Sequence, residues 1–136
     1  MTGENRRQNV LLEWERAERS MGAVETLIDG GFWAEAVSRA YYGMFYLARA
    51  LLFSAGLETR THSGVVRQLS LHFARPGVLS PAMVRRFSQM QQSREDADYE
   101  SALTFDEAAG RQAREALLEF REAVAAILAQ KGLLPH

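Results

Sequence analysis

Apolar residues recur every three or four positions along almost the whole chain, and no segment alternates between apolar and polar residues for long enough to form a strand. This spacing is typical of amphipathic helices, which bury one side of a 3.6-residue repeat. The pattern therefore predicts an all-α fold, with well over half of the chain helical and no sheet. The predicted helices cover residues 5–29, 32–55, 61–75, 80–99 and 104–130.

Glycine, proline and capping residues mark the ends of the predicted helices. Gly31, Gly56 and Gly77 follow the first three, as glycine commonly does at helix C-termini. Ser80 and Pro81 suit the N-cap and the first turn of the fourth helix. Each of these helices therefore has a start or stop signal in addition to its periodicity.

The fifth helix has its own start signal, because Thr104 and Glu107 have the T-x-x-E spacing of a capping box. Gly132 and Pro135 mark a frayed end. Since the connections are only a few residues long, consecutive helices should pack antiparallel. We expect one domain over residues 1–136, an up-and-down antiparallel bundle of four long helices plus one short helix.

The second predicted helix is apolar nearly all round. One stripe consists of Val37, Tyr41, Met44, Ala48, Leu51 and Ala55, and the other side holds Tyr42, Tyr46 and Phe53. A surface helix needs only one apolar stripe, so a helix of this kind lies at the centre of a bundle or faces another subunit. The aromatic residues on its second side predict a homodimer.

The chain has 136 residues and no cysteine, which fits one hydrophobic core and excludes disulfides and thiolate metal sites. Its start is polar, and no apolar run reaches the roughly 18 residues of a membrane span. We therefore expect a cytoplasmic protein with no membrane partner. His62, His72 and His136 are widely spaced, and phosphate-cradling glycine motifs are absent, so we expect no metal and no cofactor.

Charge is distributed unevenly although the net charge is only -1. No acidic residue occurs between Glu58 and Glu95, yet six arginines lie there, so this segment carries +6. The rest of the chain has 10 basic and 17 acidic residues, or -7. The asymmetry predicts a phosphate-bearing or acidic partner, with Arg67 and Arg85 as candidate binding residues. A GC-rich genome also explains the preference for arginine.

Two segments contain possible functional residues. The first is Ser38-Arg39-Ala40-Tyr41-Tyr42-Gly43-Met44-Phe45-Tyr46, and the second is Arg94-Glu95-Asp96-Ala97-Asp98-Tyr99. Together they resemble the HEPN superfamily, specifically the small proteins with S-R-A-Y-Y-x-x-F and R-x-x-A-D-Y motifs. The His62-Ser63-Gly64 segment that opens the third helix fits the same resemblance.

The resemblance implies a helical bundle that is usually a homodimer, often encoded beside a nucleotidyltransferase-like antitoxin of the MNT type. Many HEPN proteins are ribonucleases that use an arginine and a histidine four to six residues beyond it. After Arg94 no histidine follows before His136, so the expected proton-transfer group is missing. The implied function is a toxin-like interaction module that binds RNA or nucleotide through Arg94, Asp98 and Tyr99.

Two other functions remain open. One is a metal-independent endoribonuclease in which Tyr99 or Asp98 replaces the histidine, and the other is a structural adaptor for an acidic partner protein. Arg39, Tyr42 and His62 lie in the shared motifs and are further candidate binding residues. On its position alone, His62 is expected to be a solvated or capping residue near a helix start.

Arg94 continues the inner stripe of the fourth helix, so we expect it to be partly buried and to need a partner. The simplest alternative is an ion pair with Asp98 one turn away, which stabilises a helix by only about 0.2 to 0.5 kcal/mol. Tyr99 is a candidate control point for a nucleotidyltransferase-like partner, with Asp98 orienting its hydroxyl. Its alternative role is to cap the bundle with a packed ring.

Overall fold

The computed structural model describes residues 3–99 and 105–134. Its helices are α1 (Gly3–Asp29), α2 (Trp33–Ser54), α3 (His62–Leu69), α4 (Pro81–Tyr99) and α5 (Glu107–Gln130). A short π-helical turn, η1 (Ser70–Ala74), continues α3. No strand occurs in these two ranges, so the predicted all-α fold is confirmed.

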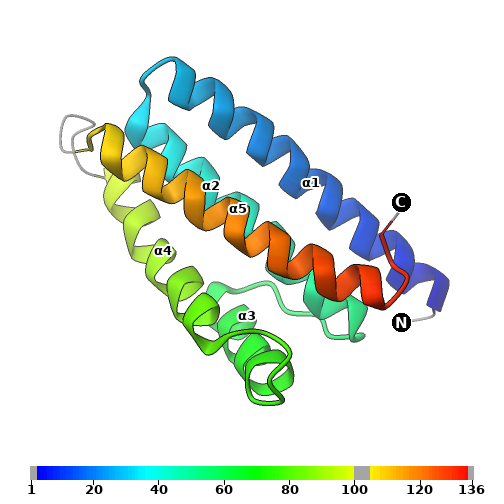
Figure 1. Ribbon diagram of the computed structural model, residues 1–136. Coiled ribbons are helices and arrows are strands. Elements are labelled where there is room, and N and C mark those ends of the chain that lie inside the picture. The colour runs from blue at the N-terminus through cyan, green and yellow to red at the C-terminus, as the bar shows by residue number, and fades with distance from the viewer. Residues whose placement is uncertain (1–2, 100–104, 135–136) are drawn as a thin grey trace.

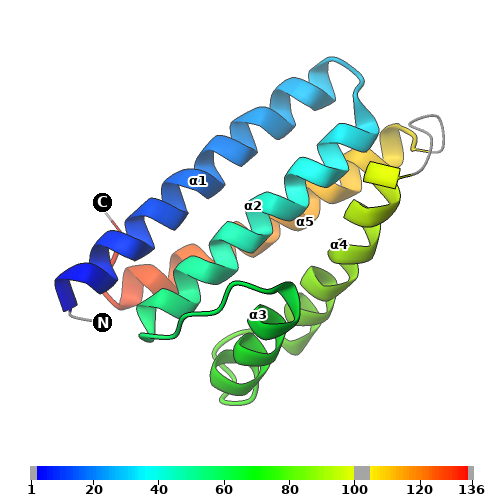
Figure 2. The same ribbon diagram turned by 180° about the vertical axis from the view of Figure 1, so that it is seen from behind.

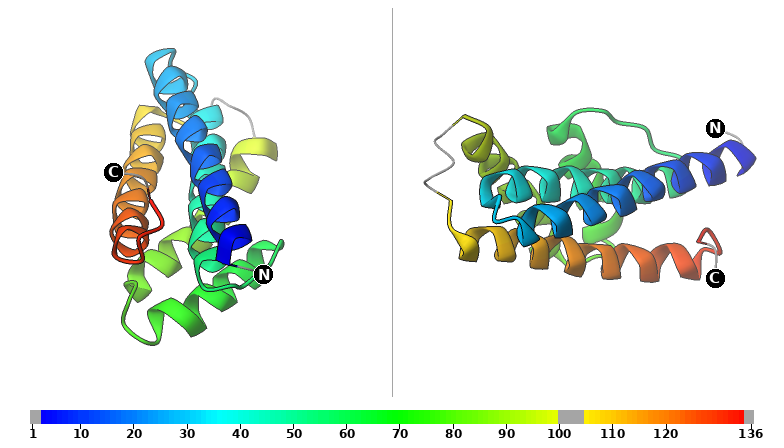
Figure 3. Two further views of the ribbon diagram at one scale, coloured as in Figure 1. Left: turned by 90° about the vertical axis from the view of Figure 1, so that its right-hand side faces the viewer. Right: turned by 90° about the horizontal axis from the view of Figure 1, so that it is seen from above.

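Helix α2 is the centre of the bundle. It packs against α1, α5 and α4, whereas α4 and α5 contact each other only sparingly. The axes of α1, α2 and α5 lie along one direction, and α4 is inclined to them (Figures 1 and 3). The described ends of the chain meet at one end of the bundle, where Arg7 donates a hydrogen bond of 3.1 Å to the carbonyl of Gly132. The central position predicted for the second helix is thus confirmed.

An aromatic stack joins three helices in the core. Tyr41 of α2 stacks on Phe87 of α4 with ring centroids 5.8 Å apart, and Phe87 stacks on Phe120 of α5 at 5.9 Å. All three residues are buried. Rings of this size dominate the apolar area of a small core. The stack therefore links α4 to both α2 and α5, although α4 and α5 make few other contacts with each other.

The helix starts follow the sequence signals in part. The hydroxyl of Thr61 caps α3 by accepting a hydrogen bond from the Gly64 amide at 3.1 Å. Asp106 caps α5 in the same way, with its carboxylate 2.9 Å from the amide of Ala109. The predicted capping box is therefore wrong, because Glu107 is already the first helical residue. Its other member, Thr104, lies outside the described residues, as do Pro135 and His136.

Helix α1 buries two polar residues that the apolar pattern does not predict. Glu13 is 2% exposed and Ser20 is 4% exposed, whereas Trp14 and Met21 are only partly buried. Glu13 forms ion pairs with Arg16 at 2.7 Å and with Arg49 of α2 at 3.7 Å.

Within the described ranges, no helix is long and apolar enough to cross a membrane.

Candidate functional site

Arg94 of α4 lies against the aromatic residues of α2. Its guanidinium carbon is 5.5 Å from the ring centre of Tyr41 and 5.7 Å from that of Tyr42. Its Nη1 donates a hydrogen bond of 2.8 Å to Asp98, and its side chain is 17% exposed. The predicted partial burial of Arg94 is therefore confirmed. We call Tyr41, Tyr42, His62, Arg94 and Asp98 the Arg94 cluster.

The pair with Asp98 does not satisfy the whole guanidinium. Glu95 lies 3.9 Å from Nη2, and the Nε of Arg94 is buried without a hydrogen-bond partner in the part of the chain that the structure describes. Burial lowers the pKa of Arg94, because it disfavours the charged form. Electrostatic attraction to Tyr42, Asp98 and Tyr41 raises the pKa by more, so that the pKa of Arg94 lies above its usual value. Arg94 is thus a permanent cation with unused hydrogen-bonding capacity.

His62 belongs to the same cluster, although it comes from the start of α3. Its Nδ1 is 2.9 Å from the hydroxyl oxygen of Tyr41, and its ring lies 5.1 Å from that of Phe87. His62 is half-buried, and Thr61 provides the cap. The expectation of a solvated or capping His62 is therefore wrong: the short hydroxyl of Thr61 reaches the helix amide, which leaves the imidazole to pack inward.

The protonation states of this pair follow from their surroundings. Burial lowers the pKa of His62, and the nearby charge of Arg94 lowers it further. Burial also raises the pKa of Tyr41 to about 12, despite the opposing effect of Arg94. At neutral pH the imidazole and the phenol are both uncharged. In the tautomer with its proton on Nδ1, His62 donates to Tyr41 and leaves Nε2 free to accept a proton.

Tyr99 is separate from these contacts. It is 83% exposed and makes no hydrogen bond with another described residue, and Asp98 is bound to Arg94. Neither an Asp98-oriented hydroxyl nor a packed ring is found, so the expected orientation by Asp98 and the alternative of a packed cap are both wrong, while the role of Tyr99 as a control point stays a prediction. Its hydroxyl is accessible to a partner, whereas Asp98 is engaged in the Arg94 cluster.

The other candidate binding residues fall into two groups. Arg39 of α2 adjoins the cluster, because its guanidinium is 5.8 Å from the ring centre of Tyr42. Arg67 and Arg85 are exposed, and Arg85 borders a separate, mostly apolar groove between α3, η1 and α4. In the acid-free segment, Arg86 forms an ion pair with Glu119 of α5. Among the residues that the structure describes, Arg67 and Arg85 make no ion pair or ring contact with the Arg94 cluster.

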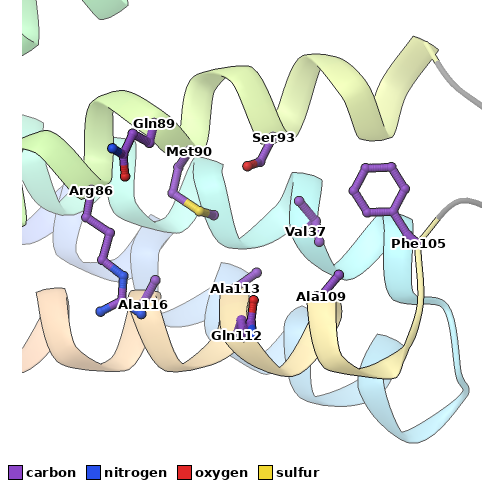
Figure 4. A pocket seen from close by; sticks show the side chains of 10 residues that line it. All are labelled: Val37, Arg86, Gln89, Met90, Ser93, Phe105, Ala109, Gln112, Ala113 and Ala116. Carbon is purple, nitrogen blue, oxygen red and sulfur yellow. The ribbon is translucent and has the colours of Figure 1, made fainter.

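A cleft of about 280 Å³ lies between α4 and α5 (Figure 4). Its lining is largely apolar, including Val37, Met90 and Phe105, and is edged by the amides of Gln89 and Gln112. It shares no lining residue with the Arg94 cluster. No group of three or more potential metal ligands was found among the residues the structure describes. The Arg94 cluster therefore remains the place where charge, aromatic rings and a histidine come together.

Comparison with known proteins identifies the family. A sequence model of the HEPN domain matches residues 11–131, which include the whole Arg94 cluster. A Methanocaldococcus jannaschii protein named "Putative toxin" is 34% identical over 89 residues, 65% of this chain and 60% of that protein. A UPF0332 protein of Pyrococcus horikoshii is 40% identical over 62 residues, 46% of this chain and 44% of that protein. A UPF0332 protein of Thermotoga maritima is 28% identical over 104 residues, 76% of this chain and 79% of that protein.

The chain thus spans less than two-thirds of the first two relatives, and the names of the relatives differ. The match to the domain is broader, since it covers α2, α3, α4 and α5 completely and most of α1. The chain belongs to the HEPN domain family.

Proposed function

We propose that this protein is the toxin-like half of a toxin and antitoxin pair, and that its Arg94 cluster binds RNA or a nucleotide. The observation that carries the proposal is the Arg94 cation, held over the rings of Tyr41 and Tyr42 with only 17% of its side chain exposed. The relatives named as toxins support the toxin-like part.

The chemistry of the cluster fits a phosphate. A guanidinium binds phosphate through two parallel hydrogen bonds, which are stronger than those between neutral groups. The aromatic rings hold the cation in place, so little conformational entropy is lost when a ligand binds. Asp98 is exposed and is hydrogen-bonded to Arg94. A phosphate that binds Arg94 would displace the Asp98 carboxylate from the guanidinium.

A second candidate function is RNA cleavage, and His62 is the observation that favours it. In this reaction the free Nε2 of His62 takes the proton of a ribose 2′-hydroxyl, whose oxygen attacks the neighbouring phosphorus. The bond from phosphorus to the 5′-oxygen breaks and a 2′,3′-cyclic phosphate forms. A water molecule protonates the leaving oxygen, and the resulting hydroxide takes the proton from His62. Arg94 stabilises the charge that develops on the phosphate oxygens. His62 fits this role better than Tyr99 or Asp98, because burial and the charge of Arg94 keep its imidazole neutral, whereas Asp98 is bound to Arg94 and Tyr99 is exposed outside the cluster.

Regulation at Tyr99 forms part of the proposal. Its exposed hydroxyl lies one residue beyond Asp98, which is bound to Arg94. A nucleotidyl group added there by a nucleotidyltransferase-like (MNT) antitoxin would bring a phosphate next to the site and repel RNA by charge and by volume. Mass spectrometry of the protein co-expressed with its genomic neighbour tests this. An unmodified wild type that behaves like Tyr99→Phe in growth assays would refute it.

A homodimer is also proposed, because the α2 side chains of Tyr42, Phe45 and Tyr46 remain only partly buried. Light scattering at high micromolar concentration should give twice the chain mass of 15.3 kDa. A particle of the chain mass would contradict the dimer.

The deciding experiment is incubation of the purified protein with labelled RNA at low salt. We expect wild type to bind RNA, and Arg94→Ala to bind about tenfold more weakly or worse, since a charge-assisted contact is lost. The control is Arg111→Ala, which removes an exposed arginine of α5 paired with Glu107. Loss of cleavage with retained binding in His62→Gln would select the ribonuclease. Absence of RNA binding, with salt-sensitive capture of an acidic protein, would select the adaptor.

A further inference from the structure

A groove of about 440 Å³ lies between α3, η1 and the first half of α4. Figure 2 shows α3 and α4 on the side of α2 away from α1. The groove shares no lining residue with the Arg94 cluster or with the α2 aromatic side chains proposed for the dimer. Its lining consists of apolar residues, two serines and the arginines Arg75 and Arg85, with no acidic and no aromatic residue.

The floor of the groove is apolar. Val66 and Ala74 line it from α3 and η1, and Val84 lines it from α4. Val84 is buried, whereas Val66 and Ala74 pack against the core and stay partly exposed. The floor is therefore continuous with the hydrophobic core and open to a partner.

The π-helical turn places a cation at one edge of this floor. The amide of Arg75 donates a hydrogen bond of 2.9 Å to the carbonyl of Ser70, five residues earlier. Because a π turn contains more residues than an α turn, it brings Arg75 to the side of Ser70, and an α-helix would carry it further round the axis. Turns of this kind occur frequently at functional sites.

Arg85 provides a second cation, on the α4 side of the groove. Both arginines are exposed, and neither Arg75 nor Arg85 forms an ion pair with any residue that the structure describes. No acidic residue occurs between Glu58 and Glu95, so no neighbour in the sequence neutralises them. An apolar floor edged by two uncompensated positive charges is complementary to a segment that is both apolar and acidic.

We propose that an acidic amphipathic helix of a partner protein docks in this groove. Its apolar side chains contact the floor, and its carboxylates pair with Arg75 and Arg85. From Pro81 to Ser88, α4 rises about 10 Å, which is the span of anchors at i, i+3, i+4 and i+7 on a docking helix. The inference goes beyond the proposed function, because it requires no ligand at Arg94.

An RNA strand fits this groove less well than a helix does. Proteins that bind single strands combine cations with aromatic rings on which the bases stack, and no aromatic ring lines the groove. The apolar floor offers a phosphate no hydrogen bond, whereas the apolar side of a helix gains from its burial. A contact of this small size is typical of weak, transient interfaces, so we expect an affinity in the micromolar range.

The test measures fluorescence anisotropy of three labelled peptides of about 14 residues, four helical turns each. The first has leucine at i, i+3, i+4 and i+7 with glutamate on both flanks, the second has lysine in place of each glutamate, and the third is a scramble of the first. Only the first should bind wild type, and high salt should weaken its binding. Absence of binding by all three, or equal binding of the glutamate and lysine peptides, would overturn the proposal.

Two variants test the two parts of the groove separately. Arg75→Glu with Arg85→Glu should weaken binding of the glutamate peptide at least about tenfold at low salt, because two attractive charges become repulsive. Val66→Ser should weaken it about fivefold to tenfold at low and high salt alike, because part of the apolar floor is lost. Arg19→Glu with Arg111→Glu makes the same charge change on α1 and α5 and is the control. Equal affinity of the Arg75 and Arg85 double variant and this control would overturn the docking site.

RNA binding distinguishes the groove from the Arg94 cluster. Arg94→Ala should weaken RNA binding and leave the affinity for the glutamate peptide unchanged, so either site can fail while the other stands. An equal loss of peptide affinity in Arg94→Ala would overturn the separate groove. If oligouridine binding is lost in the Arg75 and Arg85 double variant and the glutamate peptide binds neither protein, the groove is an RNA surface and the proposal is wrong.

Discussion

The hydroxyl oxygen of Tyr41 lies 2.9 Å from Nδ1 of His62, and this contact joins α2 to the start of α3. Tyr41 also stacks on Phe87 and lies beneath the guanidinium of Arg94. One tyrosine thus links the core of the bundle, the histidine and the cation. Its ring serves packing, and its hydroxyl fixes the orientation of the imidazole.

Tyr41→Phe removes the hydroxyl and keeps the ring. We expect the free energy of unfolding to fall by about 1 kcal/mol, the usual net value of one hydrogen bond whose other partner stays partly buried. Denaturant unfolding measures the change. Tyr46→Phe is the matched control, because the structure gives Tyr46 ring contacts but no hydrogen bond among the described residues. Equal effects of the two changes would show that the contact with His62 contributes nothing.

Stability should depend on pH through His62. Its folded pKa lies below 6.5, so the unfolded chain binds more protons in that range, and stability is lost as the pH falls below about 6.5. His62→Gln cannot titrate and should lose less stability between pH 7.5 and pH 5 than wild type. Unfolding curves at both pH values measure this difference. His72→Gln, at an exposed histidine, should retain the wild-type dependence; identical slopes in all three proteins would contradict the burial of a neutral His62.

Asp98→Asn separates a structural pair from a ligand site. The change weakens a contact within α4 and should cost only about 0.2 to 0.5 kcal/mol of stability. It also frees Arg94 from a competing carboxylate, so RNA should bind severalfold more tightly at low salt. Fluorescence anisotropy measures the affinity. Weaker or unchanged RNA binding would show that Arg94 exists mainly to pair with Asp98.

Packing at the centre of the bundle can be tested at two helical glycines. A Cβ on Gly43 of α2 would lie 2.8 Å from a methyl group of the buried Leu117, whereas a Cβ on Gly22 of α1 would meet nothing within 4 Å. Gly43→Ala should therefore destabilise the fold by about 1 to 3 kcal/mol. Gly22→Ala should stabilise it by about 0.5 to 1 kcal/mol, because alanine favours the helix. Thermal unfolding measures both, and equal responses would contradict the close approach of α2 and α5.

The fold could be predicted because each helix carries its own periodic signal and the short connections leave few ways to pack. Because residues 32–55 are apolar nearly all round, the sequence predicted that this helix lies at the centre of the bundle or faces another subunit, and the structure places α2 at the centre. Buried Glu13 could not be predicted in this way, because a carboxylate is buried only where a specific cation meets it, here Arg16 and Arg49. The ion pair between Glu13 and Arg49 forms only when α1 packs on α2.

The site was predicted only in part, for a similar reason. The spacing along α4 indicated that Arg94 turns inward toward a partner. His62 is far from Arg94 in the sequence and precedes it, whereas the motif implied by the family resemblance places the histidine after the arginine on the same helix. The helix packing that brings α3 to α2 and α4 supplies a histidine from another element. A signal was present in the His62-Ser63-Gly64 segment, but its position near a helix start favoured the simpler capping role.

The most direct measurement follows the side chains of His62 and Arg94 by NMR while single-stranded RNA is added at low salt. A ligand bound at the Arg94 cluster should shift the ring signals of His62 and the guanidinium signals of Arg94, with saturation and with reversal at high salt, while His72 stays unchanged. Binding of RNA with unmoved His62 and Arg94 signals would contradict the proposed site.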